Sequence, residues 1–294
     1  MLKKILISFL TVFFFLIAGG SRGEAFVPQT PHLLYLMVGK IKEPAGLTVH
    51  QVRRILDPAS DTVLKNLPES GKHTGPDPSA SLEETLTYLF PGKLRAQVHG
   101  TAAPQFYVVS DGAAVRVDGG QVISMALSPF DSYTDILLYR DYEQLDLRLQ
   151  AAGVNTQSVT FQRLDGRICY FIGQPPMDKK QSPGLWIDKD SFFPVRYLLQ
   201  KGPWQVDVWY DDWQRVSRTW YPMAIRILVN DRVFAEISAD SIALAAGFAS
   251  DLFDVDLILA KFPKADDADP SENGHKDRIK ALDKELEEFN KLYD

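Results

Sequence analysis

Short runs of alternating apolar and polar residues, separated by turn dipeptides, constrain the fold of this chain more than any other feature. Alternation with a period of two is typical of strands that bury one face. A dipeptide such as Asp111-Gly112 between two runs favours a tight hairpin, because glycine readily adopts the positive φ that these turns need. The clearest runs lie at residues 93–99, 105–117, 121–127, 158–172 and 223–237.

The number and spacing of these runs predict the fold class. We count ten to twelve strands joined mostly by short links, which indicates a meandering antiparallel sheet. An open, flat sheet of that size would be unusual, so the sheet should curve strongly. The expected fold is mainly β with some α: an incomplete, strongly curved antiparallel β-barrel, or half-barrel, covered by helices.

Two segments carry a helical period instead. Residues 30–41 begin with Thr30 as a candidate N-cap and Pro31 in the first turn. A second helix is expected between Pro129 and Gly153. Neither apolar stripe has another large surface to pack on, so both helices should cover the concave face of the sheet as a removable lid. The stripes consist of Leu33, Leu36 and Met37 in the first helix, and of Leu138, Tyr142, Leu145 and Leu149 in the second.

The N-terminus predicts export. A positively charged start precedes the apolar run 5–17, and Gly23 and Ala25 fit the pattern that signal peptidase reads. Thirteen helical residues rise about 20 Å, less than the roughly 30 Å of a bilayer core, so a cleaved signal peptide over residues 1–25 is favoured over a retained anchor. With no cysteine near the cleavage point, the chain is not expected to be a lipoprotein. The expected location is the periplasm.

Three regions remain after removal of the signal peptide. Residues 26–262 form the β-rich body, and within it the proline-, glycine- and serine-rich segment 57–81 reads as a mobile surface loop. Residues 263–294 combine an acidic linker with an amphipathic C-terminal helix. Its apolar residues from Ile279 to Tyr293 are spaced 3-4-3-4 over about two heptads, which fits either a short coiled coil or a helix docked on the body.

Charge and motifs exclude several classes of function. Without residues 1–25 the chain keeps 29 basic and 37 acidic residues, a net charge of −8, which argues against nucleic acid as a partner. The five histidines are scattered, and HxH, HExxH and CxxC motifs do not occur. Cys169 is the single cysteine and is expected to be a buried strand residue. We therefore expect no metal, no cofactor and no enzymatic activity.

Four segments resemble one known family. Tyr88 to Arg95 (YLFPGKLR), Val109 to Gly112 (VSDG), the stretch from Arg163 to Arg196 with its LWIDKDSFFPVR segment, and Trp220 to Pro222 (WYP) are similar, in this order, to strands and hairpins of the LolA/LolB outer-membrane lipoprotein-sorting family. The resemblance implies an incomplete barrel whose apolar cavity holds acyl chains beneath covering helices. Many members carry a basic residue directly before the strand proline, where it can latch the lid; here that residue is Phe90.

The leading hypothesis is a periplasmic carrier or chaperone whose cargo is a lipid or an acylated protein, working with inner- or outer-membrane partner proteins. The alternatives are an envelope-stress sensor or regulator on the same fold, acting by protein–protein contact, and an unrelated enzyme. An ordinary packed core is also compatible with the same apolar positions. Besides the helical stripes, the candidate cavity residues are Phe90, Leu94, Ala96, Phe106, Val108, Trp186, Met223, Ile225 and Ile227.

Overall fold

The computed structural model describes residues 27–42, 44–56, 80–175, 181–202, 204–245 and 247–265. The predicted signal peptide, nearly all of the 57–81 segment and residues 266–294 lie outside these ranges. The predictions made for them stay predictions. Among the described residues, no helix is long and apolar enough to cross a membrane.

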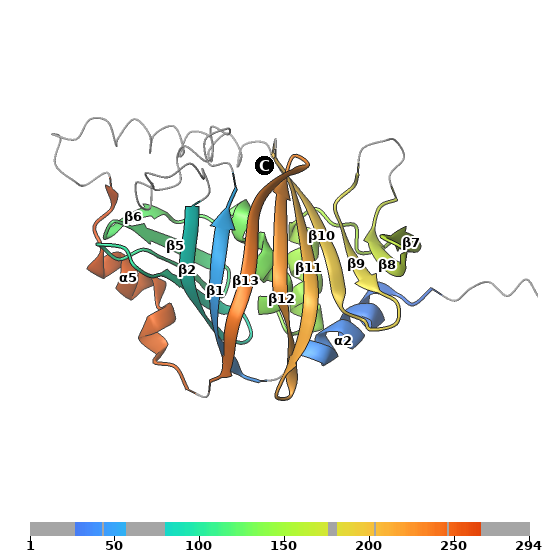
Figure 1. The fold of residues 1–294 in the computed structure, drawn as a ribbon, viewed down its shortest axis with the longest axis horizontal. Coiled ribbons are helices and arrows are strands. Elements are labelled where there is room, and N and C mark those ends of the chain that lie inside the picture. The colour runs from blue at the N-terminus through green and yellow to red at the C-terminus, as the bar shows by residue number, and fades with distance from the viewer. Residues whose placement is uncertain are drawn as a thin grey trace, which may run out of the picture.

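Thirteen strands form one antiparallel sheet in the order β6-β5-β4-β3-β2-β1-β13-β12-β11-β10-β9-β8-β7 (Figure 1). Strand β1 pairs with both β2 and β13, so the two halves of the chain meet at the centre of the sheet. The strands are β1 (Gly46–Ile55), β2 (Ala80–Leu89), β3 (Lys93–Val98), β4 (Phe106–Ser110), β5 (Ala113–Asp118), β6 (Gln121–Ser124), β7 (Val159–Leu164), β8 (Arg167–Gly173), β9 (Gly184–Asp188), β10 (Pro194–Lys201), β11 (Trp204–Val216), β12 (Thr219–Val229) and β13 (Arg232–Leu244).

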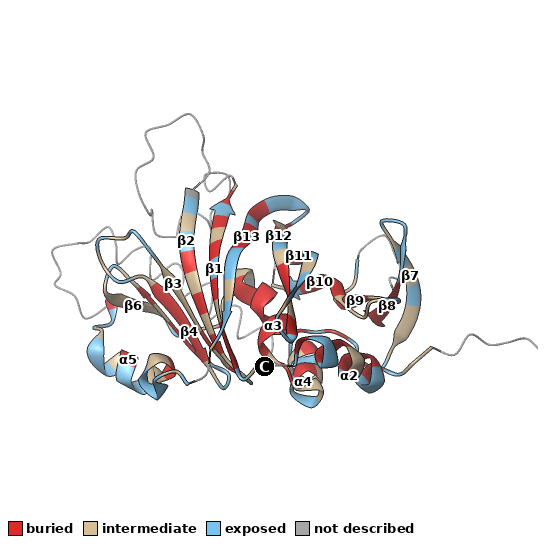
Figure 2. Ribbon diagram, turned by 60° about the horizontal axis from the view of Figure 1, so that its bottom comes forward, coloured by how far each residue is buried: buried red, intermediate tan, exposed pale blue. Residues whose placement is uncertain are grey.

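The sheet curves without closing. Its end strands β6 and β7 do not pair with each other, and the sheet bends around the helices that lie on its concave side (Figures 1 and 2). The predicted fold class, an open and strongly curved antiparallel barrel with helices, is confirmed. The hairpin turns at Asp111-Gly112 and Asp165-Gly166 have the positive φ values that the dipeptides predict.

The helical segments differ in detail from the prediction. Helix α2 (Thr30–Ile41) is confirmed, but its N-cap is Gln29, and the Thr30 hydroxyl donates instead to the carbonyl of Thr156 at 2.5 Å. The predicted second helix is three pieces: η2 (Pro129–Thr134), α3 (Asp135–Leu138) and α4 (Tyr142–Ala151). Two further elements follow the last strand, η3 (Ser250–Phe253) and α5 (Val255–Lys261).

The concave face holds the main core. Leu33 of α2, Leu137 of α3 and Leu145 of α4 lie in one cluster with strand residues such as Val208 and Ile227, and all five are 0% exposed. In Figure 2, α3 lies within the curve of the sheet, with α2 and α4 beside it. The predicted covering of the concave face by α2 and the 129–151 segment is therefore what the structure has.

The convex face carries two smaller cores. Helix α5 covers β4 and β5, where Ile258 packs against Phe106, Val108, Val115 and Val117. Further along the sheet, a second cluster on strands β8, β9 and β10 consists of Cys169, Phe171, Trp186, Val195 and Leu198. Both faces of these strands are consequently buried, and Cys169 is a buried strand residue, as expected from the sequence.

Candidate functional site

Most of the predicted cavity residues meet on the concave face. These residues join the main core cluster: Leu33, Met37, Leu94, Leu138, Leu145, Leu149, Ile225 and Ile227 as fully buried members, with Phe90, Ala96, Tyr142 and Met223 packed partly buried against it. Leu36 is half-buried on α2. The structure thus places residues from β3, from β12 and from the turn after β2 opposite residues from the covering helices.

Three predicted residues lie on the opposite face. Phe106 and Val108 belong to the cluster beneath α5, and Trp186 packs against Phe171 with ring centroids 4.5 Å apart. The prediction that they line the concave hollow is wrong. On a strand buried on both faces, alternation cannot tell which face is concave. Their neighbours Tyr107, Val109 and Leu185 occupy the concave positions instead.

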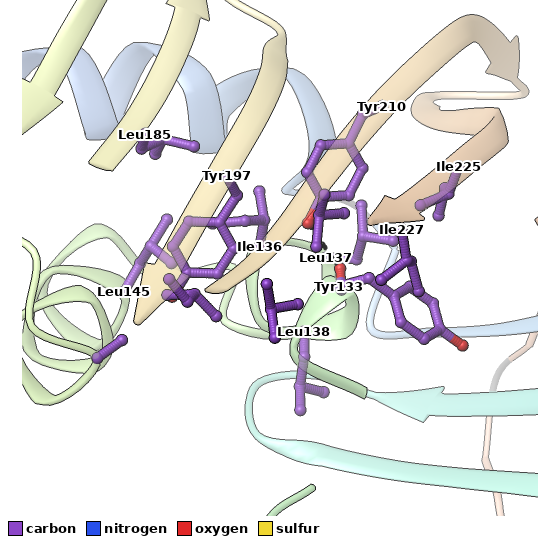
Figure 3. Close-up of a cluster of buried hydrophobic side chains, with 14 of the residues drawn as sticks. Tyr133, Ile136, Leu137, Leu138, Leu145, Leu185, Tyr197, Tyr210, Ile225 and Ile227 are labelled. Carbon is purple, nitrogen blue, oxygen red and sulfur yellow. Dashed lines mark hydrogen bonds between the residues drawn. The ribbon is translucent and has the colours of Figure 1, made fainter. Parts of the chain in front are cut away.

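The centre of the concave face is filled by residues that helical periodicity did not single out. Tyr133, Ile136 and Leu137 are at most 1% exposed, and residues 131–138 are buried without interruption. Figure 3 shows Ile136 and Leu137 against Tyr197 of β10 and Tyr210 of β11. A run buried on all sides has no apolar stripe. The signal in the sequence was the short apolar run itself.

A buried charge cluster joins η2 to the sheet. Arg53 of β1 pairs with Glu84 of β2 at 3.2 Å and with Asp131 of η2 at 3.1 Å, and it donates to the Tyr133 hydroxyl at 2.9 Å. Arg116 of β5 forms a second ion pair with Asp131. Burial alone would raise the pKa of the Asp131 carboxyl, but the two arginines outweigh it and hold that pKa below its ordinary value. We call Arg53, Glu84, Arg116 and Asp131 the charge clasp.

The clasp predicts how stability depends on pH. Because the folded-state pKa of Asp131 is depressed, its contribution is present above the ordinary carboxyl pKa of about 4 and is lost as the pH falls through the lower folded value. We expect Asp131→Asn to lower the free energy of unfolding at pH 6, and the difference from wild type to shrink as the pH falls below about 4. Urea unfolding between pH 6 and pH 2 measures both.

Asp190→Asn is the matched control, since the Asp190 side chain is 93% exposed, and its difference from wild type should stay near zero throughout. A difference between wild type and Asp131→Asn that stays constant down to pH 2 would contradict an ionised clasp.

The pKa of the Asp135 carboxyl is shifted in the opposite direction. Burial raises its pKa, so its contribution is present at low pH and is lost as the pH rises through the raised value.

A second contact holds the middle of the covering segment, between α3 and α4. Arg140, between α3 and α4, lies with its guanidinium 3.7 Å from the Phe90 ring centroid and donates to the carbonyl of Leu137 at 3.1 Å. Its Nη1 is 3.4 Å from the Thr219 hydroxyl, which itself donates to the carbonyl of Ile41 at the end of α2. Burial lowers the pKa of Arg140 to about 9, so the group remains charged at neutral pH. Here the aromatic ring of Phe90 lies in the turn directly after β2, and the basic group of Arg140 comes from the covering segment.

The described residues offer little for metal chemistry. No group of three or more histidine, cysteine, aspartate or glutamate side chains in the described ranges could hold a metal ion. Burial raises the pKa of the Cys169 thiol to about 11, which makes it a poor nucleophile at neutral pH. The candidate site is therefore the apolar concave face together with the helices that cover it.

Comparisons with known proteins place this chain beside several solved structures. Neither a family model nor a curated protein matches it. It is similar to a LolA superfamily protein from Nitrosomonas europaea, with 10% identity and a TM-score of 0.49 over 78% of this chain and 99% of that one. A putative outer membrane lipoprotein-sorting protein domain from Vibrio parahaemolyticus gives 12% identity and a TM-score of 0.43 over 78% and 97%. A DUF1329 family protein from Desulfovibrio piger gives 13% identity and a TM-score of 0.40 over 79% and 100%.

Proposed function

We propose that this protein is a periplasmic carrier or chaperone, a divergent relative of the LolA/LolB family, that binds the acyl chains of lipids or of lipid-modified proteins on the concave face of its sheet. The observation that carries the proposal is that helices, and not further strands, cover this face. The two ends of the sheet stay unpaired, so the covering segments can leave without breaking the barrel.

The covering segments are short enough to depend on what they cover. Helix α3 has 4 residues and α4 has 10, and isolated helices shorter than about 12–15 residues are marginal in water. Their stability must come from packing against the concave face. An acyl chain offers the same kind of partner to that face, because each CH₂ group moved from water contributes about 0.8 kcal/mol.

The same segments protect the empty protein. An exposed apolar patch larger than a few hundred Å² is rare in monomeric soluble proteins and favours aggregation. With the lid in place, strand residues such as Leu94 and Ile227 are 0% exposed. The charge clasp then holds the start of the covering segment at η2, and the Arg140–Phe90 contact holds its middle between α3 and α4. Release of these contacts accompanies loading.

Lipid loading from vesicles tests the proposal. Purified, delipidated protein is incubated with phosphatidylglycerol–phosphatidylethanolamine vesicles, separated from them by flotation, and extracted for mass spectrometry. We expect acyl lipid to leave with the protein in a stoichiometric amount, on the order of one molecule per chain. Protein that returns free of lipid, from vesicles and from the envelope of the cells that made it, would overturn the proposal.

The alternative of a regulator that acts through protein–protein contact rests on residues 263–294, nearly all of which lie outside the described residues. Pull-down from envelope extracts with and without residues 266–294 separates the two. A carrier should load lipid equally well in both forms, whereas a regulator should lose its partner with the tail.

A further inference from the structure

Tyrosines are unusually prominent on the concave face. Six strand tyrosines in the described ranges belong to the main core cluster, and each is at most 8% exposed. They come from six different strands and are Tyr88, Tyr107, Tyr170, Tyr197, Tyr210 and Tyr221. If a cargo needed only a hydrocarbon surface, these positions would be better filled by phenylalanine or leucine, because every buried hydroxyl needs a partner.

One of these hydroxyls depends on the lid. Tyr210 of β11 donates a hydrogen bond of 2.8 Å to the backbone carbonyl of Tyr133 in η2. That carbonyl is a peptide amide acceptor which the lid places against the sheet, beside Ile136 and Leu137 (Figure 3). When the lid leaves, the Tyr210 hydroxyl loses its acceptor inside an apolar surface, and leaving it unpaired is costly.

A second hydroxyl has no acceptor even with the lid closed. Tyr197 of β10 is 0% exposed, and its hydroxyl has no hydrogen-bond partner among the described residues. Its ring lies beside Ile136 and Leu145 of the lid and one strand away from Tyr210 (Figure 3). Unpaired buried hydroxyls are uncommon in proteins and call for a specific explanation.

Both hydroxyls are donors at any physiological pH. Burial raises the pKa of Tyr197 and of Tyr210 well above the ordinary value, so neither ionises. The charged groups that act on them, Asp135 and Arg148, belong to the lid and leave with it. A protonated phenol on the face that remains favours a hydrogen-bond acceptor over a hydrocarbon that cannot supply one. An ester or amide carbonyl at the head of an acyl chain is such an acceptor, and it resembles the peptide carbonyl of Tyr133.

We propose that Tyr210, together with Tyr197 on the neighbouring strand, forms a carbonyl-binding subsite. In the closed protein the lid carbonyl of Tyr133 accepts from Tyr210 alone, and in the loaded protein the ester or amide carbonyl of an acyl cargo takes its place and also accepts from Tyr197. This inference rests on the proposed carrier function and narrows its substrate class. The cargo is an acyl lipid or an acylated protein, and a chain of equal length attached through an ether is a poor substitute.

A matched pair of lipids tests the subsite. Vesicles contain equal amounts of dipalmitoyl phosphatidylglycerol and its dihexadecyl ether analogue. The two lipids have the same head group and differ only at the two carbonyls. A parallel arm uses a dipalmitoylglyceryl-cysteine peptide against its dialkyl analogue, which separates phospholipid from acylated protein as the source. The ratio of ester to ether lipid in the recovered protein is measured by mass spectrometry.

We expect the lipid recovered with the wild type to contain more ester than ether. Each ordinary hydrogen bond to a carbonyl should raise the ratio of ester to ether about fivefold. Tyr210→Phe and Tyr197→Phe should each lower the ratio, and the double variant should bring it close to one. Tyr35→Phe is the control, since the Tyr35 side chain is 60% exposed on α2, and it should keep the wild-type ratio.

Equal recovery of ester and ether lipid by the wild type would overturn the subsite and leave the carrier function standing. Recovery of neither lipid would overturn both. A preference for ester that survives in the folded double variant would place carbonyl recognition elsewhere and likewise reject the inference. Circular dichroism of each variant confirms that a lost preference does not reflect a lost fold.

Discussion

Replacing Leu145 by alanine is expected to lower the free energy of unfolding of the empty protein by about 2–5 kcal/mol and, at the same time, to increase its apparent affinity for lipid. Leu145 of α4 is 0% exposed and belongs to the main core cluster with Tyr197. The loss of stability follows from the cavity that alanine leaves. The gain in affinity follows because the loaded protein no longer needs the contact.

The gain has a thermodynamic origin. If the binding-competent open form is a small fraction of the empty protein, the apparent Kd is the intrinsic Kd divided by that fraction. A substitution that weakens the closed form by 1.4 kcal/mol therefore improves the apparent Kd about tenfold, until the open form predominates. Urea unfolding measures the first effect, and titration with dipalmitoyl phosphatidylglycerol vesicles measures the second.

Leu198→Ala is the matched control. Leu198 is 1% exposed, but it lies in the convex cluster with Cys169 and Phe171, away from the lid. It should destabilise the protein by a similar amount and leave lipid affinity unchanged. If Leu145→Ala destabilises the protein and its affinity stays at the wild-type value, the helices are structural and the lid hypothesis fails.

The contacts between the lid and the sheet are as close as those of an ordinary core. Leu33, Leu138, Leu145 and Leu149 are at most 1% exposed, as buried as the strands that they cover. A stripe of apolar residues predicts which face packs, but not how closely. Under the proposed function the lid must stay closed until cargo replaces it, so close contacts between the lid and the sheet agree with that proposal.

Strands β3 to β8, β12 and β13 were predictable because they depend on local alternation and on turn dipeptides. Strands β1 and β2 gave no such signal. Gln51, Arg53 and Glu84 stand at buried positions of these two strands where alternation requires apolar residues. These polar residues interrupt the alternation that would have predicted the two strands. Two of them, Arg53 and Glu84, belong to the charge clasp, whose four members come from four separate elements and are brought together only by the fold.

The faces of the outer strands were not predictable for a different reason. Strands β4 and β9 are each buried on both sides, since α5 covers one and a convex cluster lies on the other. Period-two alternation then has no polar face to mark the outside. For this reason Phe106 and Trp186 were assigned to the wrong face of the sheet.

Arg53→Met should cause the largest loss of stability among single substitutions in the clasp, about 3–5 kcal/mol. The change leaves Glu84 and Asp131, which are 5% and 8% exposed, without the charge that both share. Arg116 still pairs with Asp131, so Glu84 becomes the uncompensated group. Arg54→Met is the control one residue away, because its pair with Glu236 is about half exposed on both sides and contributes at most about 1 kcal/mol.

The double variant Arg53→Met/Glu84→Gln separates two effects of losing Arg53: the loss of the contact that holds η2 against β1, and the unpaired charge left on Glu84. Glutamine keeps an acceptor for the 2.7 Å hydrogen bond from Gln51 and removes the stranded charge, so at least half of the lost stability should return. Asp131 would then no longer be tied to β1, and vesicle loading should exceed that of the wild type. If stability recovers while loading stays at the wild-type level, the clasp does not hold the lid.

If Arg53→Met lowers the free energy of unfolding by less than about 1 kcal/mol, the cluster is not a buried ion-pair network in solution. Loss and recovery of stability together with enhanced loading are expected only when the contact between β1 and η2 keeps the concave face closed.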